Sequence, residues 1–304
     1  MTIKIFLIGL IFVVILMPSL KVEALESKTI KTTYGTVEYS CEGTGEPVLV
    51  VHGIFGGVDQ AIQTGKNIVG NNFKIIGVSR FGYLKSSLPE NSTPVDQAAA
   101  YKELLDKLQI KEVFVLAASA GGAPSIKFAL KYPERTKGLI LVGSDSPSQG
   151  EIKGPTGPPS FLLNDFIFRI ALFKPFRGLM RSSLFGIEKD TYRNASQNEK
   201  EQLDRIFELL LPVKSRKPGI INDTKITNLD MNKNYNKYVL EDMKVPTLVF
   251  HAKNDPMASF ERAQTMAERI PDSQFIEFKK GGHLLFGHQK EIQEKIKKFI
   301  NEDD

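Results

Sequence analysis

Three residues of this chain have side chains that together could carry out nucleophilic catalysis. Ser119, Asp255 and His283 each come shortly after a run of apolar residues of the kind that forms a buried strand. A serine hydroxyl is a poor nucleophile at neutral pH, so it needs a histidine to take its proton and an acid to orient that histidine. Open α/β sheets place their sites at the carboxyl edge of the strands, so we expect these side chains to meet there. The chemistry they predict is attack of the serine on a carbonyl carbon.

The turn that carries Ser119 has the composition of a sharp connection from a strand to a helix. Ala117 and Gly121, two residues before and two after the serine, are small, as a tight turn requires. The usual pattern is G-x-S-x-G, and Ala117 replaces the first glycine while keeping the steric requirement. Such a turn lifts the hydroxyl to the start of a helix, where free N–H groups favour developing negative charge. The pentapeptide alone is equally compatible with a turn of small residues in which the serine has no catalytic role.

The acid and the other histidines have alternative assignments. Asp145 also follows an apolar run, so it competes with Asp255, which the proline after it places in an extended turn. His251 alternates within an apolar strand and is expected in the core. We expect His52 to shape a loop through hydrogen bonds, and His288, at the start of the last helix, to be solvated.

Alternating strand and helix patterns predict the framework that positions these residues. The β-patterned or apolar runs are residues 29–33, 36–40, 47–51, 73–78, 113–116, 138–143, 245–251 and 273–278. The first two are predicted to form an antiparallel hairpin. The later runs are almost continuously apolar and are separated by helical patterns, which indicates a parallel sheet with helices on both faces. The predicted fold class is therefore α/β.

Residues 146–244 interrupt this alternation between the sixth and seventh predicted strands. Residues 161–176 are apolar on nearly every side and predict one helix, residues 199–211 predict an amphipathic helix, and residues 212–238 are polar and irregular. We expect a helical insertion. Its apolar helix either packs in the insertion's own small core or provides an apolar surface above Ser119, for an acyl group or a membrane.

Residues 1–24 have the pattern of a targeting segment. Lys4 precedes residues 5–20, which carry no charge. A spanning helix needs about 20 apolar residues, so a cleaved secretory signal is favoured and an uncleaved membrane anchor is the alternative. The protein is then exported, either secreted or anchored at the outer face of the cytoplasmic membrane. The sheet domain is expected in residues 25–145 and 245–304, on either side of the insertion.

Composition excludes several functional classes. The net charge is +5, but the lysines are scattered and no basic stripe with interleaved aromatic residues is present, so no nucleic-acid partner is predicted. Cys41 is the one cysteine, which excludes an intrachain disulfide and a cysteine-based metal cluster. The motifs H-E-x-x-H, G-x-G-x-x-G and the P-loop are absent, so neither a metal nor a nucleotide cofactor is predicted.

The motifs together resemble those of the α/β-hydrolase superfamily, over essentially everything after residue 24. The matching features are His52-Gly53, Arg80-Phe81-Gly82-Tyr83-x-x-Ser86, the turn at Ser119, Asp255 and Gly282-His283. The resemblance implies a catalytic triad of Ser119, His283 and Asp255. It also implies an oxyanion hole formed by the backbone N–H groups of Ala120 and of either Ile54 or Phe55. The insertion corresponds to the family's cap domain, and a serine at position 119 excludes the dehalogenase and epoxide-hydrolase branches, which use aspartate there.

The predicted function is that of a serine hydrolase that acts through an acyl-enzyme. A carboxylesterase or lipase-like enzyme for apolar esters is favoured, with a small-molecule ester or other acyl compound as its substrate. An aminopeptidase and a C–C bond hydrolase share the same motifs. A non-catalytic binding protein on a hydrolase fold is the alternative from another class. Residues 1–24 would allow association with a membrane.

Overall fold

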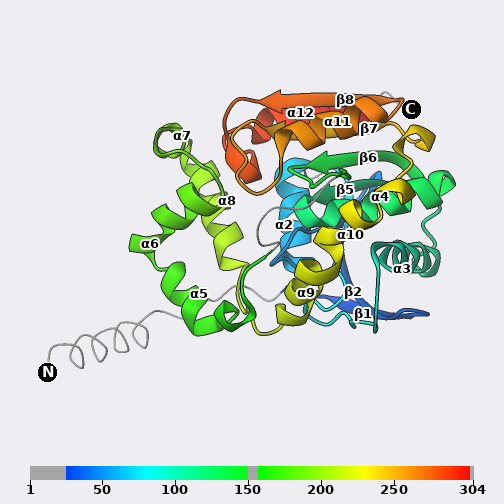
Figure 1. The fold of residues 1–304 in the computed structure, drawn as a ribbon, viewed down its shortest axis with the longest axis horizontal. Helices are drawn as coiled ribbons and strands as arrows, with labels where there is room; N and C mark the ends of the chain where they lie inside the picture. The colour runs from blue at the N-terminus through cyan, green and yellow to red at the C-terminus, as the bar shows by residue number, and fades with distance from the viewer. Residues whose placement is uncertain (1–24, 71, 150–156, 302–304) are drawn as a thin grey trace, which may run out of the picture.

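An eight-stranded sheet with the strand order β1-β2-β4-β3-β5-β6-β7-β8 forms the centre of the molecule (Figure 1). The structure is a computed structural model that describes residues 25–70, 72–149 and 157–301. The strands are β1 (Lys28–Thr32), β2 (Gly35–Glu42), β3 (Pro47–Val51), β4 (Lys74–Val78), β5 (Val113–Ala118), β6 (Thr136–Val142), β7 (Thr247–Ala252) and β8 (Ser273–Phe278). β2 pairs antiparallel with β1 and β4, and all pairs from β4 to β8 are parallel. The predicted α/β class, with its N-terminal hairpin and mostly parallel sheet, is confirmed.

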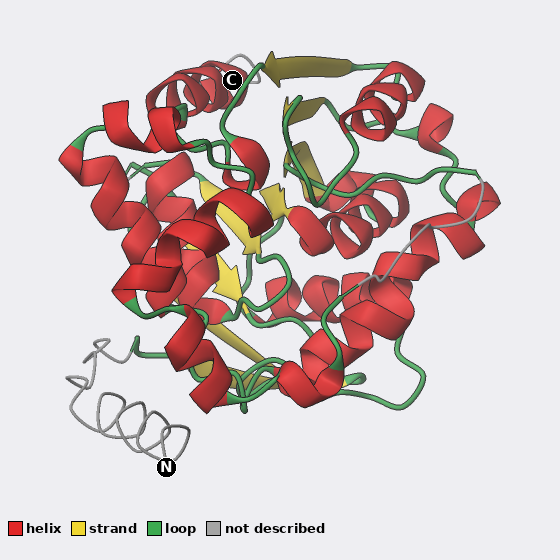
Figure 2. Cartoon of the chain, turned by 60° about the vertical axis from the view of Figure 1, so that its left-hand side comes forward, coloured by secondary structure: helices red, strands yellow, loops and turns green. Residues whose placement is uncertain are grey.

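Helices cover both faces of this sheet, as Figure 2 shows. They are α2 (Val58–Ile68) and α12 (Gln289–Asn301) on one face, and α3 (Pro94–Lys107), α4 (Gly122–Lys131) and α11 (Phe260–Arg269) on the other. Successive strand residues point to opposite faces, so Val48 packs with the first group and Leu49 with the second. Burial on both faces explains why these strands are continuous apolar runs in the sequence.

The insertion between β6 and β7 is helical, as predicted. Its α-helices are α5 (Asp165–Ala171), α6 (Lys174–Leu179), α7 (Lys189–Asn194), α8 (Gln197–Glu208), α9 (Lys217–Asn222) and α10 (Asn228–Lys233). In Figure 1, α5 to α8 stand beyond the ends of the strands, whereas α9 and α10 lie along the sheet domain. Met231 and Tyr238 pack in the main core together with residues of α3 and α4. The second half of the insertion therefore shares its core with the sheet domain, and the boundaries 146 and 244 stay a prediction.

The single helix predicted for residues 161–176 is wrong. The segment holds a short 3-10 turn (Ser160–Leu162), α5 and the start of α6. Asn164 caps α5 by accepting a hydrogen bond from the backbone N–H of Phe166, and Phe173 is extended before α6. Pro175 in the first turn of α6 has no N–H to donate and would clash with the preceding turn of a continuous helix. Phe161 is 75% exposed, whereas Leu172 is buried.

The irregular structure predicted for residues 212–238 is also wrong in part. α9 continues through a π-helical turn (Asp223–Thr227) into α10. Arg216 and Asp223 are both buried and pair with residues of the sheet domain. The helices are therefore fixed by tertiary ion pairs, and the polar residues that made them appear irregular are partly in the interior.

Within the described residues, no helix is both long enough and apolar enough to cross a membrane. The signal or anchor predicted for residues 1–24 lies outside the residues that the structure describes.

Candidate active site

Ser119 occupies the turn between β5 and α4 with a backbone φ of 50°. A positive φ is uncommon for a residue with a Cβ and is maintained only where the surroundings enforce it. A Cβ added at Gly121 would lie 2.6 Å from the carbonyl oxygen of Val51 and 2.8 Å from that of His52, so glycine is required there. Ala117 is fully buried, which shows that the turn accommodates a methyl group at that position. The sharp strand-to-helix turn predicted around Ser119 is present.

His283 and Asp255 form a hydrogen-bonded pair after β8 and β7. The Nδ1 atom of His283 lies 2.8 Å from Oδ2 of Asp255. The backbone N–H groups of Met257 and Ala258 donate to the other carboxylate oxygen, at 2.8 and 3.1 Å. Burial alone would raise the pKa of Asp255, but the charge of His283 and these hydrogen bonds hold it below its usual range. An ionised carboxylate only accepts hydrogen bonds, so Nδ1 of His283 carries a proton and Nε2 is free to act as a base.

The insertion contacts this pair directly. The backbone N–H of His283 donates to the carbonyl oxygen of Phe185, which follows the π-helical turn Met180–Leu184, at 2.8 Å. Asn254 donates to the carbonyl oxygen of Gly186 at 3.0 Å and accepts from the N–H of Gly282 at 2.9 Å. The loops that carry the aspartate and the histidine are thus tied to each other and to the insertion.

Asp145, the alternative acid, lies in the loop after β6 but does not hold His283. Its Oδ1 accepts from the backbone N–H of Ser146 at 3.0 Å and is 3.8 Å from Nη2 of Arg262. Burial raises the pKa of Asp145 above its usual range, against the lowering effects of Arg262 and the Ser146 N–H. Among the described residues, the carboxylate hydrogen-bonded to the His283 ring is that of Asp255.

The other three histidines make contacts inside the protein, among them His52 and His288. His52 is fully buried, donates from Nδ1 to the carbonyl oxygen of Gly53 at 2.7 Å, and accepts at Nε2 from the backbone N–H of Arg80 at 3.0 Å. Burial lowers its pKa well below its usual range, and Arg80 lowers it further. This matches the expected role of shaping the loop after β3. His288 is half-buried and stacks on Phe278 with ring centroids 4.1 Å apart, so it is less solvated than predicted.

His251 is in the core, as expected, but it also touches the acid. Its side chain is fully buried, and Nε2 lies 3.1 Å from the carbonyl oxygen of Ala258 and 3.5 Å from Oδ2 of Asp255. Burial lowers the pKa of His251 below its usual range. A neutral His251 whose Nε2–H points at Ala258 and Asp255 packs against the carboxylate.

The loop after β3 carries Ile54 and Phe55, the two alternative backbone donors predicted for the oxyanion hole. Phe55 has a positive φ of 65°, and its backbone N–H donates to the hydroxyl of Tyr83. Burial raises the pKa of Tyr83 well above its usual range, and this hydrogen bond acts in the opposite direction. Ile54 and Phe55 both line the cavity, so the choice between their N–H groups for the oxyanion hole, beside that of Ala120, stays a prediction.

A buried polar cluster supports this loop, and sequence reasoning gave it no role. Arg80 pairs with Asp223 through both of its terminal nitrogens, and the Tyr83 hydroxyl donates to the same carboxylate. Arg216, fully buried, donates to the carbonyl oxygen of Gly56 at 3.2 Å and pairs with Asp59 on α2 at 2.7 Å. In the sequence, the motif Arg80-Phe81-Gly82-Tyr83 contains the half of the cluster that belongs to the sheet domain. Nothing in the sequence marked Asp223 or Arg216 as its partners.

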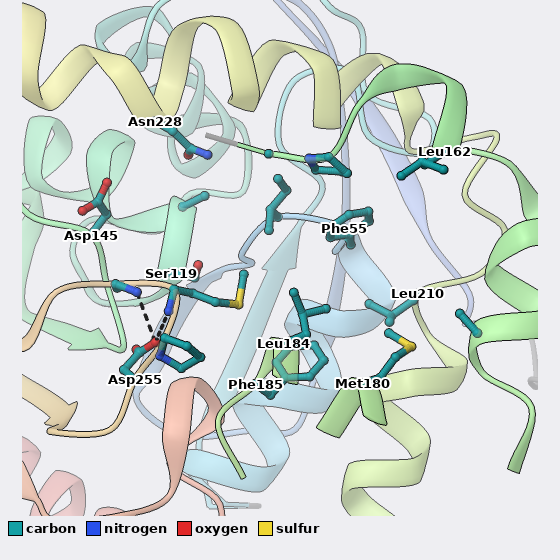
Figure 3. Close-up of a pocket in the computed structure, with 18 of the residues that line it drawn as sticks. Phe55, Ser119, Asp145, Leu162, Met180, Leu184, Phe185, Leu210, Asn228 and Asp255 are labelled. Atoms are coloured by element: carbon teal, nitrogen blue, oxygen red, sulfur yellow. Dashed lines mark hydrogen bonds between the residues drawn. The ribbon is translucent and has the colours of Figure 1, made fainter. Parts of the chain in front are cut away.

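A cavity of about 860 Å³ opens above Ser119, between the sheet domain and the insertion. Its wall is mainly apolar: Ile54, Phe55, Leu162, Ile167, Phe168, Met180, Leu184, Phe185 and Leu210 all contribute. Its polar lining includes Ser119, Asp145, Asn228, Asp255 and Arg262. Figure 3 shows Ser119 and Asp255 together, with Asp145 on one side of them and Leu184 and Leu210 on the other. Among the described residues, no group of three or more His, Cys, Asp or Glu side chains is placed to hold a metal ion.

A family model described as the alpha/beta hydrolase fold matches residues 46–288 of this chain. The chain belongs to the α/β-hydrolase fold family. The match covers most of the 304 residues, from β3 to the start of α12. The predicted family membership is confirmed, and this protein is a hydrolase.

Several curated relatives of this hydrolase are similar to it in sequence. The uncharacterized hydrolase YcgS of Bacillus subtilis is 40% identical over 115 residues, which are 38% of this chain and 40% of that protein. This match thus spans less than half of the relative. The uncharacterized carboxylesterase nap of B. subtilis is 25% identical over 288 residues, which are 90% of this chain and 85% of that one. A 2-hydroxy-6-oxononadienedioate/2-hydroxy-6-oxononatrienedioate hydrolase of Pseudomonas sp is 25% identical over 274 residues, covering 86% and 91%.

Solved structures share the fold of this hydrolase. An α/β-hydrolase fold protein from Nakamurella multipartita superposes with a TM-score of 0.73 at 23% identity, covering 90% of this chain and 98% of that one. The esterase EaEST from Exiguobacterium antarcticum gives a TM-score of 0.65 at 22% identity, covering 91% and 100%.

Proposed function

We propose that this hydrolase cleaves carboxylic esters with Ser119 as nucleophile, His283 as general base and Asp255 as the acid that orients His283. The observation that carries the proposal is the 2.8 Å hydrogen bond between His283 and Asp255, beside the cavity that Ser119 enters from a strained turn. The names of two similar proteins, a carboxylesterase and an esterase, support the ester assignment.

The proposed reaction has two halves. The Oγ of Ser119 attacks the ester carbonyl carbon while Nε2 of His283 takes its proton, and His283 then protonates the leaving alcohol, which gives an acyl-enzyme. A water molecule activated by the same histidine releases the acid. In both halves the ring of His283 becomes positively charged for a moment, and the ionised Asp255 stabilises that charge.

The proposed oxyanion hole consists of the backbone N–H groups of Ala120 and Ile54. Ala120 directly follows the nucleophile at the start of the helical turn, so its N–H faces the region where the carbonyl oxygen gains charge. Ile54 lines the cavity, and the loop that carries it is held by hydrogen bonds from His52 to Gly53 and from Arg216 to Gly56.

The insertion, residues 146–244, is proposed to act as the cap that selects the acyl group. Phe168, Leu184 and Phe185 of the insertion line the cavity, and the Phe168 ring packs on that of Phe55 at 5.3 Å. An apolar wall of this size suits the acyl chain of an apolar ester, because burying such a chain is favourable.

A fluorophosphonate probe and a series of p-nitrophenyl esters test the proposal. We expect the probe to label Ser119, acyl esters to be hydrolysed, and Ser119→Ala to abolish both while circular dichroism and the unfolding transition stay those of the wild type. Loss of a triad member typically lowers the rate by several orders of magnitude. A Ser119→Ala protein that keeps most of its activity would refute the mechanism, and a wild type that is neither labelled nor active would favour a binding protein.

Cleavage of a C–C bond is the second candidate, because one similar protein is named as a 2-hydroxy-6-oxononadienedioate hydrolase. The ester series, extended by a C–C substrate, separates the two functions. A vinylogous 1,5-diketone turned over faster than every ester would assign the C–C hydrolase function.

Export is proposed from residues 1–24 alone. Fractionation of the producing cell is expected to place the protein outside the cytoplasm, with Leu25 as the first residue if the segment is cleaved. Recovery from the cytosol with an intact N-terminus would contradict export.

A further inference from the structure

The cavity above Ser119 has two ends of different chemistry. Phe55, Leu184 and Leu210 form an apolar wall on one side of Ser119, whereas Asp145 and Asn228 lie on the other (Figure 3). Arg262, 3.8 Å from Asp145, also lines the cavity. Figure 3 shows this division, with Ser119 between Asp145 and the apolar residues. A substrate that reaches both ends must therefore have one apolar part and one polar part.

Asp145 is a carboxylate with acceptor capacity left over. Among the described residues its one direct hydrogen bond comes from the N–H of Ser146, and a carboxylate can accept about four. Its side chain is 26% exposed and lines the cavity. Partial burial of a carboxylate without its full set of hydrogen bonds is unfavourable. Asp145 can therefore accept a further hydrogen bond from a ligand bound at that end of the cavity.

Arg262 offsets the charge of Asp145 without donating a hydrogen bond to its carboxylate. The guanidinium donates to the carbonyl oxygen of Ser146 at 2.8 Å and to Oδ1 of Asn232 at 3.0 Å, and it stays 3.8 Å from the Asp145 carboxylate. The charges of the two side chains offset each other at this distance. An uncharged hydrogen-bond donor, such as a hydroxyl group, therefore suits this end better than an ammonium group.

Asp145 and the apolar wall lie on opposite sides of Ser119 (Figure 3). An apolar acyl chain is most favourably buried against the apolar wall. The alcohol part of an ester bound at Ser119 then extends in the other direction, towards Asp145.

We infer that Asp145 recognises a hydroxyl group on the alcohol part of the substrate, so that the preferred substrates are apolar acyl esters of polyhydric alcohols. This inference rests on the proposed ester hydrolysis. It assigns to Asp145 a binding role that is separate from the chemistry of Ser119, His283 and Asp255.

Two octanoate esters of nearly equal size test the inference. They are 2-hydroxyethyl octanoate, which carries the hydroxyl group, and propyl octanoate, which has a methyl group in its place. We expect wild-type kcat/KM to be about tenfold or more higher for the hydroxyethyl ester, because a hydrogen bond to a charged group discriminates by at least that factor. Asp145→Leu is expected to bring the ratio of the two kcat/KM values close to one, and Asp145→Asn, which keeps an acceptor oxygen, to retain part of it.

The ratio is measured within each variant, so a general loss of folded enzyme affects both esters equally and cancels. Phe166→Ala, a change at an exposed residue of the insertion, is the matched control and is expected to keep the wild-type ratio. Equal kcat/KM values in the wild type, or an unchanged ratio in Asp145→Leu, would overturn the inference and leave ester hydrolysis standing. If neither ester is hydrolysed and the probe does not label Ser119, the proposed function fails and the inference fails with it. A faster reaction with an aminoethyl ester than with the hydroxyethyl ester would also overturn it.

Discussion

The guanidinium of Arg80 is paired with the carboxylate of Asp223, and both side chains are almost completely buried, at 3% and 1% exposure. Arg80 follows β4, whereas Asp223 lies in the insertion. Burial lowers the pKa of Arg80, but Asp223 more than compensates and raises it above its usual range. The backbone N–H of Arg80 also supports His52, so this pair joins the insertion to the loop proposed to stabilise the oxyanion.

Replacement of Asp223 is expected to destabilise the protein strongly. Asp223→Asn leaves the buried charge of Arg80 without a partner, and breaking a buried pair in this way costs about 3–5 kcal/mol. Asp204→Asn is the matched control, because Asp204 pairs with Arg177 but is 46% exposed, and such pairs contribute about 0–1 kcal/mol. Urea unfolding measures both. Equal effects of the two substitutions would contradict a supporting role for the buried pair.

The two candidate acids are expected to differ in their effect on the rate. Asp255→Asn removes the charge that orients His283 and is expected to lower kcat for p-nitrophenyl acetate about 10⁴-fold. Asp145→Asn is expected to lower it at most about tenfold, because Asp145 makes no hydrogen bond to that ring in the structure. Steady-state kinetics with both purified variants decides between them, and a larger loss for Asp145→Asn would transfer the role of the acid to Asp145.

The turn at Ser119 is expected to tolerate a change on one side and not on the other. Gly121→Ala would force a Cβ against the backbone oxygens of Val51 and His52, and such overpacking costs about 1–3 kcal/mol and displaces the nucleophile. Ala117→Gly restores the usual glycine two residues before the serine and is expected to keep most of the activity. Rates and unfolding midpoints of the two variants test this. An active, stable Gly121→Ala protein would show that the turn is less constrained than the structure indicates.

Two neighbouring phenylalanines of α5 are expected to affect acyl selectivity differently. Phe168 lines the cavity, whereas Phe166 is 46% exposed. Phe168→Ala is expected to raise KM for p-nitrophenyl octanoate about tenfold or more and to change KM for the acetate little, because burial of a large side chain contributes about 1.5–3 kcal/mol. Phe166→Ala should change neither value. If Phe168→Ala raised KM equally for both esters, this residue would belong to the core of the insertion and not to the acyl site.

Acid is expected to destabilise the fold from about pH 6.5 downward. Burial lowers the pKa of both His52 and His251. Below the usual pKa of histidine the unfolded chain takes up protons that the folded protein does not, so the free energy of unfolding falls as pH decreases. Each residue contributes up to about 1.4 kcal/mol per pH unit.

Urea unfolding at pH 7.5, 6.5 and 5.5 measures this slope. His251→Gln keeps a side-chain N–H near Ala258 and removes the titrating ring, so its slope should be shallower than that of the wild type. A free energy of unfolding that is constant over this range would contradict the expected behaviour of the two histidines.

The sequence was sufficient to predict the pairing of His283 with Asp255 and the position of Ser119 on the adjoining cavity, whereas the catalytic roles of the three residues stay a prediction. Ser119, Asp255 and His283 each follow an apolar run, and parallel strands bring such positions together whatever their separation along the chain. The choice between Ile54 and Phe55 could not be made in this way, because it depends on where each backbone N–H points, which no pattern of side chains specifies.

The errors in the insertion have physical reasons. Residues 161–176 contain Pro175, and a proline indicates the start of a new helix. The prediction of one continuous helix followed the apolar pattern instead. The helices after residue 216 contain Arg216 and Asp223, which are charged but buried. Hydrophobic periodicity treats such residues as surface, and only the three-dimensional structure shows their partners.

The insertion leaves the sheet after β6 and returns at β7, and these two strands are direct neighbours in the sheet. Because the two strands are parallel, the insertion leaves at the carboxyl edge of the sheet and returns at the opposite edge, so its second half, with α9 and α10, must run along the sheet domain (Figure 1). A foreign segment grafted between β6 and β7 can differ in length and composition, but it has to include such a crossover. Such a graft would have to supply its own partners for two side chains of the sheet domain, Arg80 and Asp59. Exchange of acyl selectivity between members of the family by grafting should then succeed when the incoming segment carries an aspartate and an arginine at the places of Asp223 and Arg216.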